Sequence, residues 1–469
     1  MLPYNDKDIT SIFNYSKQLI NKCLRDFVPD AKEQKGKGGL GQLVEELFFK
    51  YDVNSRQEAD FAFVNAELKC TPLKLAVNDG DFLIKERLVC SMINYAEDWY
   101  KSFEQSHFYK KCLVMLIMFY LHQGGVSKLD LHFLFAVLWR IPEKDLLIIR
   151  NDYETIITKI RNGQAETLSE GDTMYLGACR KGQKGDSLMA QHGSDIGAPR
   201  RAWSLKTAYM RIVLDEVKKN NVDGAYCNYD LESTGLEELV SVDELRKRSF
   251  DEVIKDRFAP YMGQSYSDIC CKLGINPLTA KSKYFVIANA IAGNGKIGNV
   301  NHSEEFVKSG LTMKTVRVGK NGGIKESMSF ENIDYREVYD CEEWVDSRLY
   351  ELFTSRFMFV VYRETDNQLT LPDGKTEPEY RLDKVGFWTM PQSDLEVAMQ
   401  YWENIKHCVM NDNISPDSFW GIKKDKNFHV RPKAALAKDM VETPCGTKAK
   451  KYSYWFNAKY VKNIIDNEI

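Results

Sequence analysis

The chain of 469 residues lacks several features that mark common classes of protein. The apolar run at residues 112–121 is too short to span a bilayer and predicts a buried strand instead. The eleven cysteines include no Cys-x-x-Cys pair, which argues against a zinc site and fits a reducing cytoplasm. The segment GNGKIG at residues 293–298 lacks the Gly-Lys-Ser/Thr ending of a phosphate-binding loop, so ATP use is not expected.

The chain also lacks a strong charge of either sign, with 64 basic and 67 acidic residues, which is unlike a small, uniformly basic DNA-binding domain. The N-terminus shows no signal-peptide pattern, and residues 9–24 predict an amphipathic helix, so we expect a cytoplasmic protein outside the membrane. The length predicts two or three domains. Polar breakers place the seam in a packed linker at 221–242, between domains at 1–220 and 243–469.

The most informative segments are residues 37–45, KGGLGQLVE, and residues 60–69, DFAFVNAELK. Alternating apolar residues in the second segment predict a hairpin of two strands joined by a tight turn. Glu67 and Lys69 are two residues apart, so on a strand they point to the same face. Asp60 is then expected on the adjoining strand, which would bring two carboxylates and one ammonium together.

A helix is predicted to begin near Gly41, and it would direct Glu45 toward the same place. Carboxylates hold a hard cation such as Mg²⁺, which activates water and neutralises the charge that builds on a phosphate. Lys69 could orient that water and stabilise the transition state. The acid-x-Glu-x-Lys string alone would equally fit a surface hairpin with a Glu–Lys ion pair. The two spaced glycines just before the helix favour the catalytic interpretation.

At these spacings the two segments resemble the MutH-type endonucleases, a branch of the restriction-endonuclease fold that cuts DNA at GATC with Mg²⁺. The resemblance implies that the metal-binding acids are Glu45, Asp60 and Glu67 and that Lys69 is the catalytic lysine. In that family a further lysine precedes the next core strand. Lys111 is the candidate for it and Lys110 the second choice, with a solvated lysine at a strand edge as the alternative.

A second copy of the pattern follows later in the chain, where residues 305–316 align with residues 60–71. The alignment keeps one lysine and loses acids, and its pairs are Glu305 with Asp60, Thr312 with Glu67, Lys314 with Lys69, Asn289 with Glu45 and Arg356 with Lys111. Too little negative charge remains to hold a divalent cation. We therefore expect an α/β protein of two tandem restriction-endonuclease-like domains, each with a mixed central sheet flanked by helices, of which only the first hydrolyses DNA.

Two segments near the ends of the copies are basic. Residues 421–462 hold eleven basic residues against three acidic ones, and residues 176–211 hold seven against two. Such segments give affinity by releasing counterions from phosphates, and arginine is the commonest reader of guanine. The predicted DNA-binding residues are Lys37, Arg180, Lys181, Lys206, Arg431, Lys433 and Lys459, with the two arginines as base readers. A solvated basic face is the alternative.

The sequence therefore predicts a type II restriction endonuclease that uses Mg²⁺ to hydrolyse double-stranded DNA at GATC, 5′ of the G. The C-terminal copy is expected to bind a second DNA site and to regulate cutting. A monomer in solution that forms a dimer on DNA would fit one active site per chain. Two alternatives remain open from the sequence: a mismatch-repair endonuclease that nicks at GATC, and a non-catalytic sequence-specific DNA-binding protein.

Overall fold

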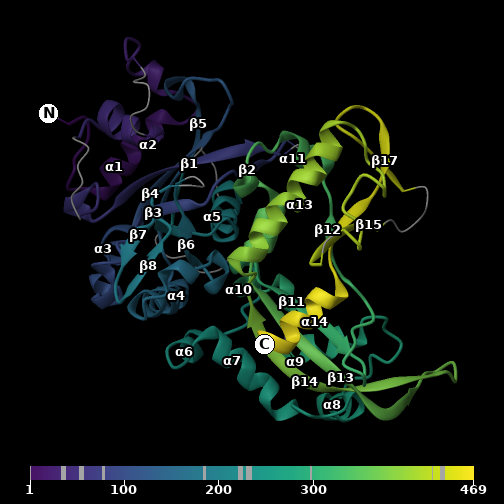
Figure 1. Ribbon diagram of the computed structural model, residues 1–469. Coiled ribbons are helices and arrows are strands. Elements are labelled where there is room, and N and C mark those ends of the chain that lie inside the picture. Colours follow the sequence, from purple (N-terminus) through teal and green to yellow (C-terminus); the bar gives the residue numbers. More distant parts are fainter. Residues whose placement is uncertain are drawn as a thin grey trace. The chain divides into compact units, whose positions relative to one another are not determined.

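The computed structural model divides into two compact units, Met1–Gly235 and Leu236–Ile469 (Figure 1). The division falls inside the predicted linker, directly after its Ser-Thr-Gly breaker. The structure describes residues 2–32, 39–51, 58–76, 80–182, 186–219, 225–228, 235–295, 298–424, 426–433 and 439–469.

The first unit is built on a mixed sheet of five strands in the order β10-β5-β4-β1-β2. β4 is the central strand, parallel to β1 and antiparallel to β5. Its first six residues are buried, as expected of a strand covered on both faces. The bounds are β1 Glu67–Leu75, β2 Phe82–Ile84, β4 Val114–Leu121, β5 Phe133–Arg140 and β10 Ala225–Asn228.

The helices of the first unit are α1 Ile9–Ser16, α2 Leu40–Leu43, α3 His107–Cys112, α4 Glu143–Arg161 and α5 Thr207–Lys219. α1 is shorter than the predicted helix at residues 9–24, since it continues only as a 3₁₀ turn at Lys17–Leu19 before Asn21 takes a positive φ of 59°. α2 begins where the sequence predicted it and continues as one π-helical segment, Val44–Phe49. In the part of the chain that is described, no helix combines the length and the apolar character needed to cross a membrane.

A smaller antiparallel sheet, in the order β3-β9-β6, completes the first unit. Its strands are β3 Leu88–Met92, β6 Leu176–Arg180 and β9 Arg201–Leu205. The glycine-rich stretch at 182–199 contains a hairpin of β7 Met189–Gln191 and β8 Ser194–Ala198. Gly193 supplies the positive φ of 68° at the hairpin turn.

The second unit repeats this plan with the sheets β11-β13-β14 and β12-β18-β15 and a hairpin β16-β17. Its strands are β11 Thr312–Val318, β12 Met328–Asn332, β13 Phe357–Thr370, β14 Thr376–Trp388, β15 Phe428–Pro432, β16 Met440–Glu442, β17 Lys448–Lys450 and β18 Tyr452–Phe456. Its helices are α6 Val242–Leu245, α7 Phe250–Phe258, α8 Tyr266–Leu273, α9 Lys283–Ala292, α10 Glu304–Ser309, α11 Tyr335–Asp340, α12 Arg348–Thr354, α13 Gln392–Met410 and α14 Ala458–Asn467.

The duplication extends to the order and pairing of the elements. β11 is parallel to β13 as β1 is parallel to β4, and each pair continues into an antiparallel partner strand. A helix of 19 residues then follows in both units, after Pro142 in the first and Pro391 in the second. Asn65 and Gly310, which the sequence alignment pairs, are both left-handed, with φ of 50° and 72°. Two copies of one fold therefore form the chain.

The registers correct one pair of the sequence alignment. Glu67 lies opposite Met115, and its counterpart Thr312 lies opposite Phe357. Arg356 therefore corresponds to the residue directly before Met115 and not to Lys111. Lys111 lies within α3, whereas Arg356 lies after the end of α12, directly before β13.

The stretch predicted as a linker contributes to both units. β10 pairs with β5 in the first sheet. Leu239 and Val240 are buried in the second unit, where their N–H groups donate to the Glu305 carboxylate at 2.9 Å each. The described ends of the predicted linker at 221–242 therefore belong to the two units, β10 to the first and residues 239–240 to the second.

Candidate active site

Strand β1 presents a carboxylate and an ammonium on one face. Lys69 Nζ lies 2.9 Å from Glu67 Oε1, and it also donates to the Cys90 carbonyl at 3.3 Å. Leu68, between them, is buried in the core on the opposite face. Burial lowers the pKa of Lys69, but the charge and hydrogen bond of Glu67, together with the nearby Cys112 and Cys90 side chains, hold this pKa above its ordinary value. The ammonium therefore stays charged beside a glutamate that is only 3% exposed.

The turn before β1 differs from the predicted hairpin. Ala62–Val64 is a single 3₁₀ turn, Asn65 is left-handed, and Phe61 forms an isolated bridge with Ala66. The apolar alternation at 60–66 therefore reflects a tight turn and not a strand. An asparagine tolerates the left-handed conformation that this turn requires better than most residues with a side chain.

The turn directs Asp60 back onto the start of β1. The Leu68 N–H donates to Asp60 Oδ2 at 2.9 Å, and the Asp60 N–H donates to Glu67 Oε2 at 3.3 Å. The two carboxylates that the sequence predicted as partners are thus adjacent, although Asp60 does not lie on a strand.

Glu45 approaches the same carboxylates from the π-helical segment that follows α2. Val44 and Phe48 of that segment are buried in the core, whereas Glu45 is half-buried. Burial and the charge of Asp60 raise the pKa of Glu45 to about 7. Burial and the charge of Glu67 raise the pKa of Asp60 to about 6. Repulsion between close carboxylates favours their protonated forms, and a bound cation would remove that repulsion.

Lys111 comes from the last turn of α3, three residues before β4 begins. Ser106 caps the start of this helix by accepting from the Tyr109 N–H at 3.0 Å. Lys111 Nζ lies 3.5 Å from Glu67 Oε1, so Glu67 faces two ammonium groups. Lys110, the second candidate in the sequence, is exposed.

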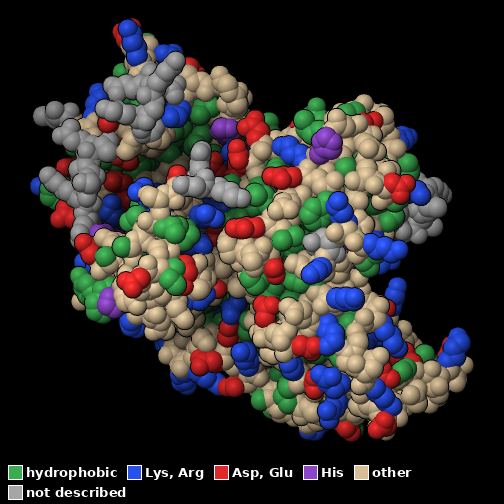
Figure 2. Space-filling view, viewed as in Figure 1, with side chains coloured by type: hydrophobic (Ala, Val, Ile, Leu, Met, Phe, Trp, Pro, Cys, Tyr) green, Lys and Arg blue, Asp and Glu red, His purple; other side chains and the backbone are tan. Residues whose placement is uncertain are grey.

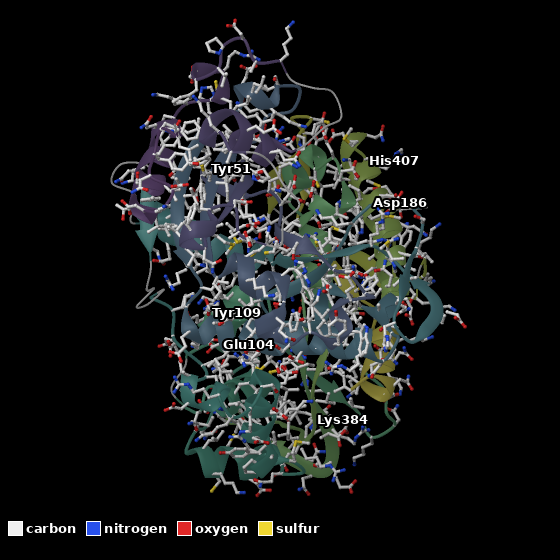
Figure 3. All side chains as sticks on the ribbon, turned by 90° about the vertical axis from the view of Figure 1, so that its left-hand side faces the viewer. Tyr51, Glu104, Tyr109, Asp186, Lys384 and His407 are labelled. Atoms are coloured by element: carbon white, nitrogen blue, oxygen red, sulfur yellow. The ribbon has the colours of Figure 1, made fainter. Side chains whose placement is uncertain are left out.

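The carboxylates fit a hard divalent cation, although the described residues contain no ready set of three Asp, Glu, His or Cys side chains for a metal. Glu67 Oε1 is engaged by Lys69 and Lys111 instead. A second observation supports the fit. The hydroxyl of Tyr51, a residue labelled in Figure 3, is buried and has no hydrogen-bond partner among the described residues. Burial, Asp60 and Glu45 all raise the pKa of Tyr51.

Sequence reasoning missed two contributors to this site. Tyr51 follows the π-helical segment, and the Cys90 carbonyl comes from β3, in the other sheet. A tyrosine and a backbone carbonyl carry no motif, so only the tertiary structure could reveal them. The nearness of Tyr51 to Glu45 in the sequence was the only available signal.

In the second unit the corresponding strand keeps the lysine and loses its acid. Lys314 on β11 donates to the Ser329 carbonyl of β12 at 3.2 Å, much as Lys69 donates to Cys90 of β3. Thr312 stands at the position of Glu67. Burial and the nearby charge of Lys433 lower the pKa of Lys314 to about 8.

The other two acid positions of the second unit serve its own packing. Glu305 is fully buried on α10, where it accepts the two N–H groups of residues 239 and 240. Asn289 on α9 accepts from the Val300 N–H at 2.7 Å and donates to the Gly298 carbonyl at 2.9 Å. These contacts hold loops, and the one carboxylate at an aligned acid position, that of Glu305, is engaged by backbone N–H groups.

The predicted DNA-binding side chains have different surroundings. Arg180, Arg431, Lys433 and Lys459 are exposed, Lys181 is half-buried, and none of the five forms an ion pair with a described residue. Figure 2 shows Lys and Arg side chains gathered over the part of the second unit where β15, β17 and α14 lie. Lys37 lies outside the described residues.

Lys206 has contacts inside its own unit. Its ammonium donates to the Thr173 carbonyl, and its charge partly offsets the burial that raises the pKa of Asp152 to about 6. That aspartate accepts three backbone N–H groups, from residues 174–176. Lys206 therefore supports the small sheet.

Arg180 and Arg431 are not equivalent positions. Leu176 of β6 lies opposite Leu205, and Phe428 of β15 lies opposite Phe456. If Leu176 and Phe428 are equivalent, then Arg431, three residues after Phe428, is equivalent to Cys179. Arg180 is therefore one position further along its strand than the equivalent of Arg431. A shift of one residue moves a side chain to the other face of a strand.

A buried Glu–Lys pair with two further carboxylates and a second lysine defines a nuclease-like site on a restriction-endonuclease-like fold. Residues 49–152 match the family described as DNA mismatch repair enzyme MutH. The chain is 31% identical over 451 residues to the type II restriction enzyme Sau3AI of Staphylococcus aureus, covering 90% of this chain and 87% of that enzyme. The chain belongs to the family of type II restriction enzymes that includes Sau3AI, and it is a deoxyribonuclease.

Proposed function

We propose that this enzyme is a Mg²⁺-dependent endonuclease that hydrolyses double-stranded DNA at GATC, 5′ of the G. The first unit cuts, and the second unit binds another copy of the site and regulates cutting. The observation that carries the proposal is the position of Glu67, which lies between two ammonium groups and beside Asp60.

Each residue has a distinct part in this proposal. Glu45, Asp60 and Glu67 would hold the cation, which supplies an activated water and neutralises charge on the phosphate. Lys69 is charged at neutral pH and lies where it can orient the water and stabilise the pentavalent transition state. Lys111 adds a second positive charge beside Glu67. Lys111 would therefore neutralise a non-bridging phosphate oxygen.

The arrangement of the chain bears on its stoichiometry. The first unit alone carries the acids, so one chain makes one nick, and a double-strand break needs two chains or two successive nicks. A monomer that pairs on DNA meets this requirement. DNA is the substrate, and the ten described cysteines are all free, so we place the enzyme in the cytoplasm.

One of the alternatives, a mismatch-repair endonuclease, remains in competition with the proposal. The similarity to a restriction enzyme spans both units, whereas the match to the MutH description is confined to residues 49–152. This difference in coverage favours a restriction enzyme over a mismatch-repair endonuclease.

The proposal is tested with Glu67→Gln, which keeps the shape of the side chain and removes its charge. On a duplex with one GATC, this variant should lose cutting in Mg²⁺ and keep binding in Ca²⁺. Equal loss of binding and thermal stability would assign Glu67 a structural role and contradict the proposal. Glu46→Gln, which changes an exposed neighbour of Glu45, is the matched control and should cut as the wild type does.

A further inference from the structure

Two lysines of the second unit meet where the first unit has its active site. Lys314 on β11 donates to the Ser329 carbonyl at 3.2 Å. Lys433, at the end of β15, donates to the carbonyl of the next residue, Phe330, at 2.7 Å. The Lys314 ammonium also lies 4.7 Å from the centre of the Phe330 ring. Both ammonium groups are thus fixed at adjacent carbonyls of β12.

No carboxylate neutralises this pair within the described residues. Thr312 stands where the first unit has Glu67. The acid whose charge acts on Lys314 is Glu331, which is engaged by Arg348 through two contacts of 2.8 and 3.0 Å. Burial of Lys314 and the nearby charge of the exposed Lys433 both disfavour the charged form of Lys314 and lower its pKa. An anion at this place would offset both the repulsion and the burial.

Each ammonium still has donors to offer. A lysine carries three N–H donors, and each of these lysines uses one for a carbonyl. Lys433 is exposed and Lys314 is partly so, which leaves the pair open to a ligand from solvent. The remaining donors suit an anion with several oxygens.

We infer that Lys314 and Lys433 form a phosphodiester-binding site that holds the DNA backbone in the second unit without a metal ion. The inference rests on the proposed function, because it specifies how the second unit takes its DNA. In the first unit, acids would bind the phosphate through a cation. In the second unit, two ammonium groups bind it directly.

The surroundings favour a nucleic-acid backbone over a free anion. The exposed residues Arg431, Lys448 and Lys450 lie on β15 and β17 of the same unit and form no ion pair with a described residue. A row of phosphates would meet several of these charges, whereas inorganic phosphate would meet only the lysine pair.

The test measures binding of a labelled duplex to the full-length enzyme in EDTA, by fluorescence anisotropy. Without a cation the acids of the first unit repel phosphate, so the second unit dominates binding. Lys314→Met should weaken binding about 10- to 100-fold, the range for one charge-assisted hydrogen bond. It should do so equally for duplexes with and without GATC, because phosphate contacts carry no sequence information. Lys314→Arg should largely retain binding.

Lys320→Met is the matched control, since Lys320 is exposed in the same unit and pairs with Asp366 at 2.7 Å. It should bind as the wild type does. Lys433→Met gives a second variant on an exposed side chain, in case Lys314→Met destabilises the unit. Inorganic phosphate at matched ionic strength should displace the duplex no better than chloride does.

Three results would overturn the inference. They are wild-type affinity of Lys314→Met and Lys433→Met in EDTA, abolition of wild-type binding by EDTA, or a loss confined to GATC duplexes. Cleavage of plasmid in Mg²⁺ by the wild type is measured in parallel. Absence of cleavage would count against the proposed nuclease function, whereas metal-free binding that depends on the two lysines would still stand.

Discussion

Lys69 and Lys314 occupy the same position in two copies of one fold. Each stands two residues after the first residue of a strand that is parallel to the next core strand. Each ammonium donates to a carbonyl of the small sheet, Lys69 to Cys90 at 3.3 Å and Lys314 to Ser329 at 3.2 Å. They differ in the side chain on the same face, which is Glu67 in the first unit and Thr312 in the second. In the proposed function, this difference separates the unit that cuts from the unit that binds DNA.

The two lysines of α3 should contribute unequally to cutting. Lys111→Ala should lower kcat by about 10²-fold, because one charge that stabilises the transition state is lost. Lys110→Ala should cut like the wild type, since that side chain is exposed. Single-turnover cleavage of a GATC duplex measures both. Equal cleavage rates for the two variants would show that Lys111 has no catalytic role.

Restoring the missing acid should not restore cutting in the second unit. In a Glu67→Gln background, Thr312→Glu should give no cleavage, because Glu305 and Asn289 are committed to backbone contacts. The new carboxylate should instead pair with Lys314 and weaken duplex binding in EDTA. Plasmid nicking and anisotropy report the two effects. Recovered nicking would contradict this prediction, because it would show that the second unit lacks only the acid at position 312.

Stability should depend on pH and cation together. The folded pKa values of Glu45 and Asp60, about 7 and about 6, lie above their unfolded values. The metal-free folded chain therefore binds more protons than the unfolded chain, and these groups make it less stable as pH rises toward 7. Cation binding requires the deprotonated carboxylates. The rise in Tm on adding Ca²⁺ should thus be larger at pH 8 than at pH 6, and the opposite order would contradict the assigned ligands.

The aligned acids Asp60 and Glu305 should give opposite phenotypes. Glu305→Ala should destabilise the second unit by about 1–3 kcal/mol for each of the two N–H groups that it leaves unpaired. The Ca²⁺-dependent rise in Tm should survive in that variant. Asp60→Asn should abolish this rise while the chain remains folded. Thermal unfolding with and without Ca²⁺ checks both variants, and a Ca²⁺ response lost in Glu305→Ala would mean that the second unit binds the cation.

Much of the architecture was accessible from the sequence. The two-residue spacing of Glu67 and Lys69 correctly placed both on one face of a strand, and the apolar run at 112–121 correctly gave the central strand. The alignment of residues 305–316 with residues 60–71 predicted that the fold is repeated, and the strand order of the two units confirms this. These features depend on local periodicity, which the sequence displays directly.

Other features depend on backbone geometry or on distant partners. The turn at 60–66 imitates strand alternation because it is short and apolar, and only the left-handed Asn65 distinguishes it. Arg180 and Arg431 were both predicted as base readers from the sequence, yet the strand pairing sets them one residue apart in the two copies. The unpartnered hydroxyl of Tyr51 becomes visible only once the core has formed around it.

The most direct test is to incubate the wild-type enzyme with Mg²⁺ and a plasmid of known sequence, and to map the ends of the fragments. The account predicts that every end lies 5′ of the G in GATC, and that EDTA or Glu67→Gln abolishes these ends. Ends at unrelated sequences, or binding without any cleavage in Mg²⁺, would contradict it.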